Sequence, residues 1–106
     1  MDRKELKVIL KEGEGYKIEF KEGIGNLDKE LVAFANASGG MIFLGITDEG
    51  GIKGLRITNK LKAQVQDIAN SCRPKIRISI EGFENVLIIH VREGEDKPYE
   101  PKFPHK

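Results

Sequence analysis

The chain has few of the features that stabilise small secreted domains or anchor a protein in a membrane. Among its 106 residues there is one cysteine, Cys72, which excludes a disulfide scaffold and a cysteine-rich zinc site. Cysteine used so sparingly is typical of a reducing compartment, so we expect a cytoplasmic protein. The longest apolar runs, at 41–44 and 86–89, fall far below the roughly 18 residues of a membrane span. The first residues do not have the pattern of a signal peptide.

Neither sign of charge is in clear excess, since 18 Lys and Arg oppose 17 Asp and Glu. Dedicated nucleic-acid-binding proteins are often far more basic, but a local basic stripe is sufficient for binding. Aromatic residues make up only 7% of the chain. Phe20, Phe34 and Phe43 have the spacing of core residues, so base stacking is not expected to dominate. The length and the 39% hydrophobic content predict one globular domain.

Three amphipathic segments predict helices. The first begins after Asp2, which has the sequence context of an N-cap. The second is predicted over 27–38 after Asn26, another favourable N-cap residue. The third is predicted over 59–72 after Thr58, and its apolar side chains recur on one helical face.

Two different hydropathy patterns predict strands. Residues 16–21 and 76–80 alternate between polar and apolar, as half-buried strands do, and Tyr16 is expected to face the core. Residues 41–46 and 86–91 are apolar almost throughout and are predicted to be covered on both faces. A short returning strand is expected at 52–55. The order of elements predicts a single two-layer α+β domain with about three helices on a mixed or mostly antiparallel sheet.

The composition changes at Gly94, where the apolar periodicity ends. Pro98, Pro101 and Pro104 lie within the final nine residues. Such a segment is expected to be extended or mobile. We therefore expect a domain over 1–93 and a proline-containing tail over 94–106. One interpretation of the tail is the start of a C-terminal region that this chain lacks.

Three linked motifs are similar to those of a known family. They are E-x-x-x-x-E-F-K at 14–21, A-F-A-N-x-x-G-G at 33–40, and a strand ending in G-[IV]-x-D at 45–48. In this order and spacing they resemble the Schlafen AlbA_2 domain over about residues 6 to 98. The resemblance implies an AlbA_2-like fold and nucleic-acid binding, commonly as one module of a transcriptional regulator. It makes DNA or RNA the expected partner.

The resemblance also implies an enzymatic alternative. Schlafen relatives cut tRNA and rRNA with three carboxylates and a divalent metal, and the matching residues here are Glu14, Glu19 and Asp48. Hard cations such as Mg²⁺ and Mn²⁺ take oxygen ligands of this kind and can activate water for phosphodiester cleavage. The competing interpretation is that all three are ordinary solvated acids, which is the common state of a carboxylate. Whether the chain is an enzyme stays open, and binding alone requires no cofactor.

Basic residues from several segments are candidate nucleic-acid contacts. Each short basic run is, alternatively, a solvated face or a set of charge pairs. A basic track assembled from several elements nevertheless suits binding to phosphates without sequence preference. The candidate residues are Lys17, Lys21, Lys53, Arg56, Lys60, Lys62, Arg73, Lys75 and Arg77.

The remaining motifs favour structural roles. Asn36 is expected to bond nearby backbone, and the alternative is a phosphate contact at the amides of Gly39 and Gly40. His90 and His105 lack the spacing of a zinc pair. Three hypotheses result: a nucleic-acid-binding module, a metal-dependent endoribonuclease, and an interaction domain that forms a homodimer through a sheet edge. No membrane partner is expected.

Overall fold

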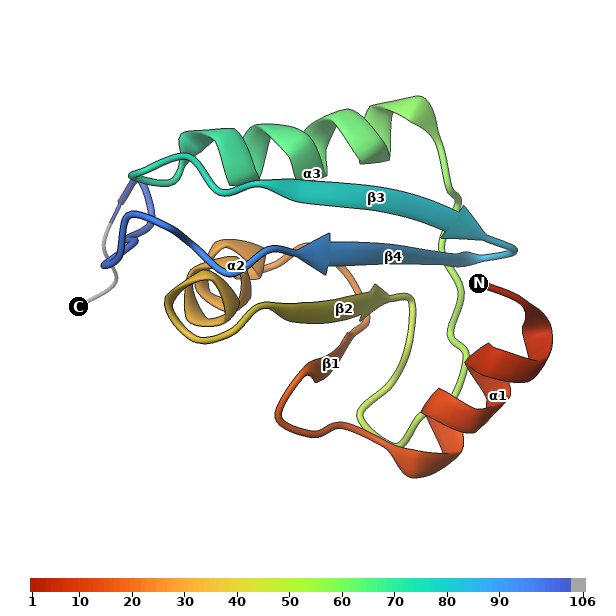
Figure 1. Ribbon diagram of the computed structural model, residues 1–106. Helices are drawn as coiled ribbons and strands as arrows, with labels where there is room; N and C mark the ends of the chain where they lie inside the picture. The colour runs from red at the N-terminus through yellow and green to blue at the C-terminus, as the bar shows by residue number, and fades with distance from the viewer. Residues whose placement is uncertain (104–106) are drawn as a thin grey trace.

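Residues 1–103 are described by a computed structural model, which contains three helices and four strands (Figure 1). The strands form one mixed sheet in the order β1-β2-β4-β3, with β1 and β2 parallel and the other neighbours antiparallel. This confirms the predicted single α+β domain. The elements are α1 (Arg3–Glu12), β1 (Ile18–Lys21), α2 (Leu27–Asn36), β2 (Gly40–Leu44), α3 (Asn59–Ser71), β3 (Ile78–Phe83) and β4 (Val86–Val91).

N-terminal caps explain where two of the helices begin. The carboxylate of Asp2 accepts the Glu5 N–H at 2.8 Å before α1, as predicted. The hydroxyl of Thr58 accepts the Leu61 N–H at 3.0 Å before α3, again as predicted. Asn26 is the N-cap residue of α2, as predicted, but its backbone is left-handed (φ 58) and its side chain makes no capping bond. Asparagine adopts that conformation more readily than most residues.

Two of the strand predictions need correction. Tyr16 was expected to face the core, but it is 78% exposed, because β1 begins only at Ile18 and the preceding residues form a turn. The predicted strand at 52–55 is reduced to a single bridge at Ile52. Gly54 has a positive φ of 84, which bends the chain away from an extended path.

Apolar side chains pack against both faces of the sheet. Helices α2 and α3 cover one face, where Leu31, Val65 and Ile89 belong to the larger buried cluster. Helix α1 packs on the other face, where the rings of Phe20 and Phe43 meet edge to face with centroids 6.1 Å apart. The α1 layer therefore adds to the predicted two-layer arrangement and covers the central strands from their second side.

The chain after β4 returns to the domain beside α2. Tyr99 is buried, with 8% of its surface exposed. Arg73 and Glu100 exchange two backbone hydrogen bonds of 2.8 Å each, which hold this segment beside the loop after α3. Residues 104–106 of the predicted tail, including Pro104 and His105, lie outside the described residues. Among residues 1–103, no helix is long and apolar enough to cross a membrane.

Candidate nucleic-acid interface

The predicted basic residues near α3 fall into two groups, one at each end of the helix. Lys60 and Lys62 lie in its first turns, whereas Arg73, Lys75 and Arg77 lie between its end and β3. A helix of 13 residues is about 20 Å long, which sets the approximate separation of the groups. Figure 1 shows α3 running beside β3, which is an edge strand of the sheet. Both groups therefore border the same side of the molecule.

The denser group contains Lys75, Arg77 and a third cation, Arg92, which the sequence analysis missed. The Arg92 N–H donates to the Arg77 carbonyl at 3.2 Å and extends the antiparallel pairing of β3 with β4. Residues directly opposite each other in such a pair project from the same face of the sheet. All three side chains are exposed, and within residues 1–103 none of them forms an ion pair.

Two hollows adjoin these three cations. The acid-lined hollow has a volume of about 670 Å³, and its lining also includes Glu93, Glu95 and Asp96. The amide-lined hollow has a volume of about 630 Å³ and lies between α3 and β3. Volumes in this range suit a small ligand or one unit of a polymer. The amide-lined hollow is bordered by Gln66, Asn70, Lys75, Ile76, Arg77, Ile78, Ser79 and Arg92.

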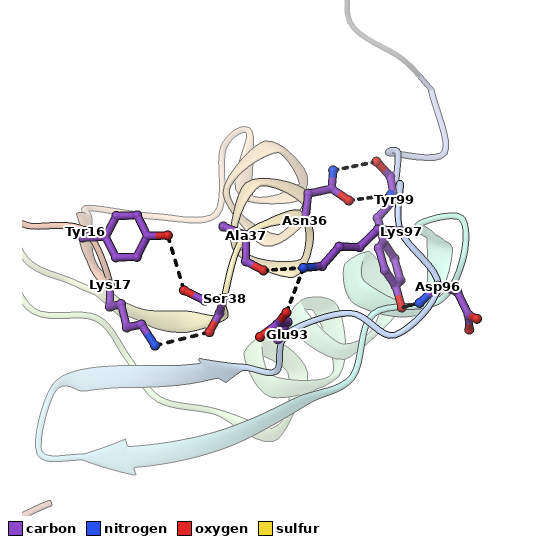
Figure 2. A network of polar contacts seen from close by, with 9 residues as sticks. All are labelled: Tyr16, Lys17, Asn36, Ala37, Ser38, Glu93, Asp96, Lys97 and Tyr99. Atoms are coloured by element: carbon purple, nitrogen blue, oxygen red, sulfur yellow. Dashed lines mark hydrogen bonds and ion pairs between the residues drawn. The ribbon is translucent and has the colours of Figure 1, made fainter.

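Other basic residues that were predicted to contact nucleic acid already interact with groups of the protein itself. The ammonium group of Lys53 pairs with Glu22 at 2.9 Å. The Lys17 ammonium donates to the carbonyl of Ser38 at 3.4 Å, a contact drawn in Figure 2. Lys21 shares β1 with Glu19, and its positive charge favours the ionised form of that carboxyl, which partly offsets a raised pKa. These residues are therefore less available to phosphates than the group around Arg77.

Asn36 fastens α2 to the C-terminal segment (Figure 2). Its Nδ2 donates to the Tyr99 carbonyl at 3.0 Å, and its Oδ1 accepts the Tyr99 N–H at 2.6 Å. The expected backbone partner is therefore 63 residues away instead of nearby. The Gly39 amide, considered above for a phosphate, donates to the Phe34 carbonyl at 2.9 Å. This geometry favours the structural role of the motif.

A second contact holds the same segment at the end of α2. The Lys97 ammonium lies 2.8 Å from both the Ala37 carbonyl and the Glu93 carboxylate. The Tyr99 hydroxyl accepts the Asp96 N–H at 3.2 Å. Together these contacts fix the acidic stretch that lines the acid-lined hollow. The family motif around Asn36 thus positions one wall of a candidate site.

Glu14 and Glu19 form an acidic pair at β1, the other edge strand. The Glu14 carboxylate accepts the Phe20 N–H at 3.0 Å, which places it beside the strand. The pKa of the Glu19 carboxyl is raised from its ordinary value near 4.5 to about 7, and burial is the largest cause. A hydrogen bond with Glu14 and repulsion from the charges of Glu30 and Glu14 contribute to this rise, whereas Lys21 opposes it.

Asp48, the third predicted acid, lies exposed in the turn after β2. It is not among the groups that shift the Glu19 pKa. Strand β1 does neighbour β2, as a shared site with Asp48 would require. Across residues 1–103, however, no group of three or more His, Cys, Asp or Glu side chains is arranged to hold a metal ion. The structure thus brings two of the three acids together.

Comparison with known proteins identifies the family. The model of the family described as Schlafen, AlbA_2 matches residues 14–106, which is most of the chain. A search of curated proteins found no match. The matched range contains all three motifs, including the glycine pair and Asn36, whose side chain fastens α2 to the C-terminal segment. The chain therefore belongs to the Schlafen AlbA_2 family, a membership consistent with a nucleic-acid-related role.

Proposed function

We propose that the domain binds DNA or RNA through the phosphate backbone, along the side formed by α3 and β3. The observation that carries this proposal is the group of Lys75, Arg77 and Arg92, three exposed cations without ion pairs in the described chain. Such cations neutralise phosphates and release condensed counterions, which drives binding. A net charge of +1 does not oppose this, because the cations are gathered locally.

The proposal also covers the compartment and the kind of protein in which the domain acts. One buried cysteine fits a reducing cytoplasm. The resemblance to AlbA_2 domains fits a module of a transcriptional regulator-like protein. No cofactor is needed, because phosphate neutralisation requires cationic side chains alone.

The test is fluorescence anisotropy of labelled DNA and RNA strands at increasing salt. Lys75, Arg77 and Arg92 are replaced together by alanine. If each contacts one phosphate, the slope of log K against log salt should fall in magnitude by about 2 on single strands and about 3 on duplexes.

A matched control removes Lys7, Lys11 and Lys29, three exposed lysines on α1 and α2, and should leave the slope unchanged. Absence of binding to DNA and RNA at low salt would reject the proposal. It would favour the interaction domain, which gel filtration of the same samples would detect as a dimer.

A second candidate function is a metal-dependent endoribonuclease, favoured by the adjoining carboxylates of Glu14 and Glu19. These two would hold Mg²⁺ or Mn²⁺, which would supply water activation. The described residues offer no third ligand arranged with them, so a centre of three carboxylates is not formed there. Incubation of RNA with Mn²⁺ tests this candidate. Cleavage that is lost in Glu19→Gln would support it, and intact RNA would reject it.

A further inference from the structure

We infer that the outer edge of β3 pairs with the same edge of a second copy of the chain, so that their two sheets join into one. The inference goes beyond the proposed function and does not depend on it. It starts from backbone groups that the sheet leaves without partners. The edge of a sheet presents a row of such groups, which a protein either protects or pairs with another strand.

The open backbone groups of β3 follow from its pairing with β4. The Arg92 N–H donates to the Arg77 carbonyl, so these two residues occupy a hydrogen-bonded position of the ladder. Such positions alternate along an antiparallel pair, so the backbone groups of Ile78, Ile80 and Gly82 point away from β4. Within residues 1–103 these outward N–H and carbonyl groups form no hydrogen bond. Donors and acceptors thus line the edge at every second residue.

The other edge strand, β1, is protected. The Phe20 N–H donates to the Glu14 carboxylate at 3.0 Å, and the Ile18 N–H donates to the Gly15 carbonyl at 3.3 Å. Lysine, proline and bulges are further devices that keep edge strands single. Strand β3 contains no lysine or proline, and its register with β4 is unbroken. It is therefore the edge that is open to a partner strand.

A second copy is the partner that uses all of these groups at once. In antiparallel pairing about a two-fold axis at Ile80, the two Ile80 residues lie opposite each other, and Ile78 lies opposite Gly82 of the second copy. This register forms about six backbone hydrogen bonds. Ile78 and Ile80 project toward the α2 and α3 layer, where both are only partly buried. The two Ile80 side chains can therefore meet, and each Ile78 faces a residue without a side chain.

The charge on β3 is compatible with this register. Glu81 is the only charged residue of the strand, and it lies opposite Ser79 of the second copy. Opposite residues have Cβ atoms about 4.5–5.5 Å apart, so the Ser79 hydroxyl, which has no partner within the described chain, can donate to that carboxylate. A register shifted by two residues would set two Glu81 carboxylates against each other. The opposite shift would move Gly82 past the end of the partner strand.

The space beside β3 has room for an added strand, because the amide-lined hollow of about 630 Å³ is bordered by Ile78 and Ser79. The proposed function assigns nucleic acid to this same side of the molecule. A second copy and a nucleic acid should therefore exclude each other. The experiment is made without nucleic acid, so that its outcome is separate from the outcome for the proposed function.

The experiment is sedimentation equilibrium of the full chain from micromolar to millimolar concentration. We expect the native chain to form a reversible dimer. Ile80→Pro removes the central outward N–H and leaves the ladder with β4 complete, since an edge strand tolerates proline where its N–H faces outward. It should raise the dissociation constant of the dimer at least about tenfold, because central hydrogen bonds are lost. Circular dichroism melting checks that the fold is retained.

A pair of substitutions at Ser79 tests the register without altering the core, because this side chain is exposed. Ser79→Glu sets like charges opposite each other and should raise the dissociation constant about fivefold. Ser79→Lys faces Glu81 of the second copy and should lower it by a similar factor. Ser71→Glu and Ser71→Lys, at an exposed serine that ends α3, are the matched controls and should leave it unchanged.

A native chain that stays monomeric at every concentration would overturn the inference, whether or not the chain binds nucleic acid. A dimer that persists unchanged in a folded Ile80→Pro variant would also overturn it. If that variant does not fold, the Ser79 pair decides. Changes of the dissociation constant in the same direction for Ser79→Glu and Ser79→Lys would reject pairing through β3 in this register.

Discussion

Glu19 makes the stability of the domain depend on pH through one side chain. Its pKa is raised to about 7 in the fold, mainly by burial, from an ordinary value near 4.5. Between these two values the folded state binds the proton and the unfolded state releases it. The contribution of Glu19 to stability should therefore be greatest in acid and should fall as pH rises through this window. The shift identifies a polar group held partly out of water at an edge strand.

Glu19→Gln should remove this dependence, because the amide carries no charge at any pH. We expect a higher melting temperature than the native protein at pH 8 and nearly the same melting temperature at pH 4. Thermal melting followed by circular dichroism at both pH values measures the difference. Glu49→Gln removes one charge from an exposed turn and serves as control. An equal change in melting temperature at both pH values would contradict the argument.

Close packing explains why the second glycine of the family motif, Gly40, has no side chain. A Cβ at this position would lie 2.4 Å from the Phe34 ring and 3.0 Å from the Lys17 carbonyl. Gly40→Ala should therefore lower the free energy of unfolding by about 2 kcal/mol, as overpacking of a core does. Urea unfolding measures the loss. At Gly25, where a Cβ would meet nothing within 4 Å, the same substitution should be nearly neutral.

At the scale of elements, the side chain of Asn36 forms two of the hydrogen bonds that join α2 to the C-terminal segment. Asn36→Ala removes both hydrogen bonds to Tyr99, one donated and one accepted. The backbone groups of Tyr99 lose their partners, so stability should fall by about 1–3 kcal/mol. Limited proteolysis should then cut the segment after β4 sooner than in the native protein. Gln64→Ala, an exposed amide change on α3, should alter neither measurement.

Hydropathy patterns that extend over a whole helix or strand predicted the elements better than short segments near turns did. The predicted helices over 27–38 and 59–72 appear as α2 and α3 with ends shifted by at most two residues, and the strand at 86–91 is β4. The two helices bury one face each and β4 is buried on both faces, so the hydropathy pattern along each element reports it directly. The predicted strand at 52–55 fails because its pattern is short and Gly54 takes a positive φ.

The candidate site was only partly predictable, because its parts meet through the fold. Lys75 and Arg77 were identified as a local basic run, whereas Arg92 stands alone in the sequence. Only the pairing of β3 with β4 brings Arg92 opposite Arg77. The burial of Tyr99 could not be predicted from the local sequence either, since its partner Asn36 is 63 residues away. The one available signal was that Arg92 directly follows the strand predicted over 86–91, two residues after His90 and so on the same face.

At the scale of the whole molecule, three cations are gathered in one place although the total charge is close to zero. Cations that form no ion pair within residues 1–103 border α3 and β3, whereas β1 at the opposite edge carries the acidic pair. A binding strand is therefore expected to follow one side of the domain and to avoid the other. The two basic groups at the ends of α3 set the length of strand that this side can hold.

This arrangement predicts how affinity depends on the length of a single strand. The groups are about 20 Å apart along α3, and phosphates follow each other at about 3.4 Å along one stacked strand. Affinity should therefore rise with length until about six nucleotides connect Lys60 and Lys62 with the group around Arg77, and then level off. The measurement is anisotropy of a series of labelled strands of increasing length. In the double variant Lys60→Ala and Lys62→Ala the plateau should begin at shorter strands, because only the Arg77 end still contacts phosphates. Removal of Lys7 and Lys29 should leave the length dependence as it is, and an identical curve for the Lys60 and Lys62 variant would show that the strand does not follow α3.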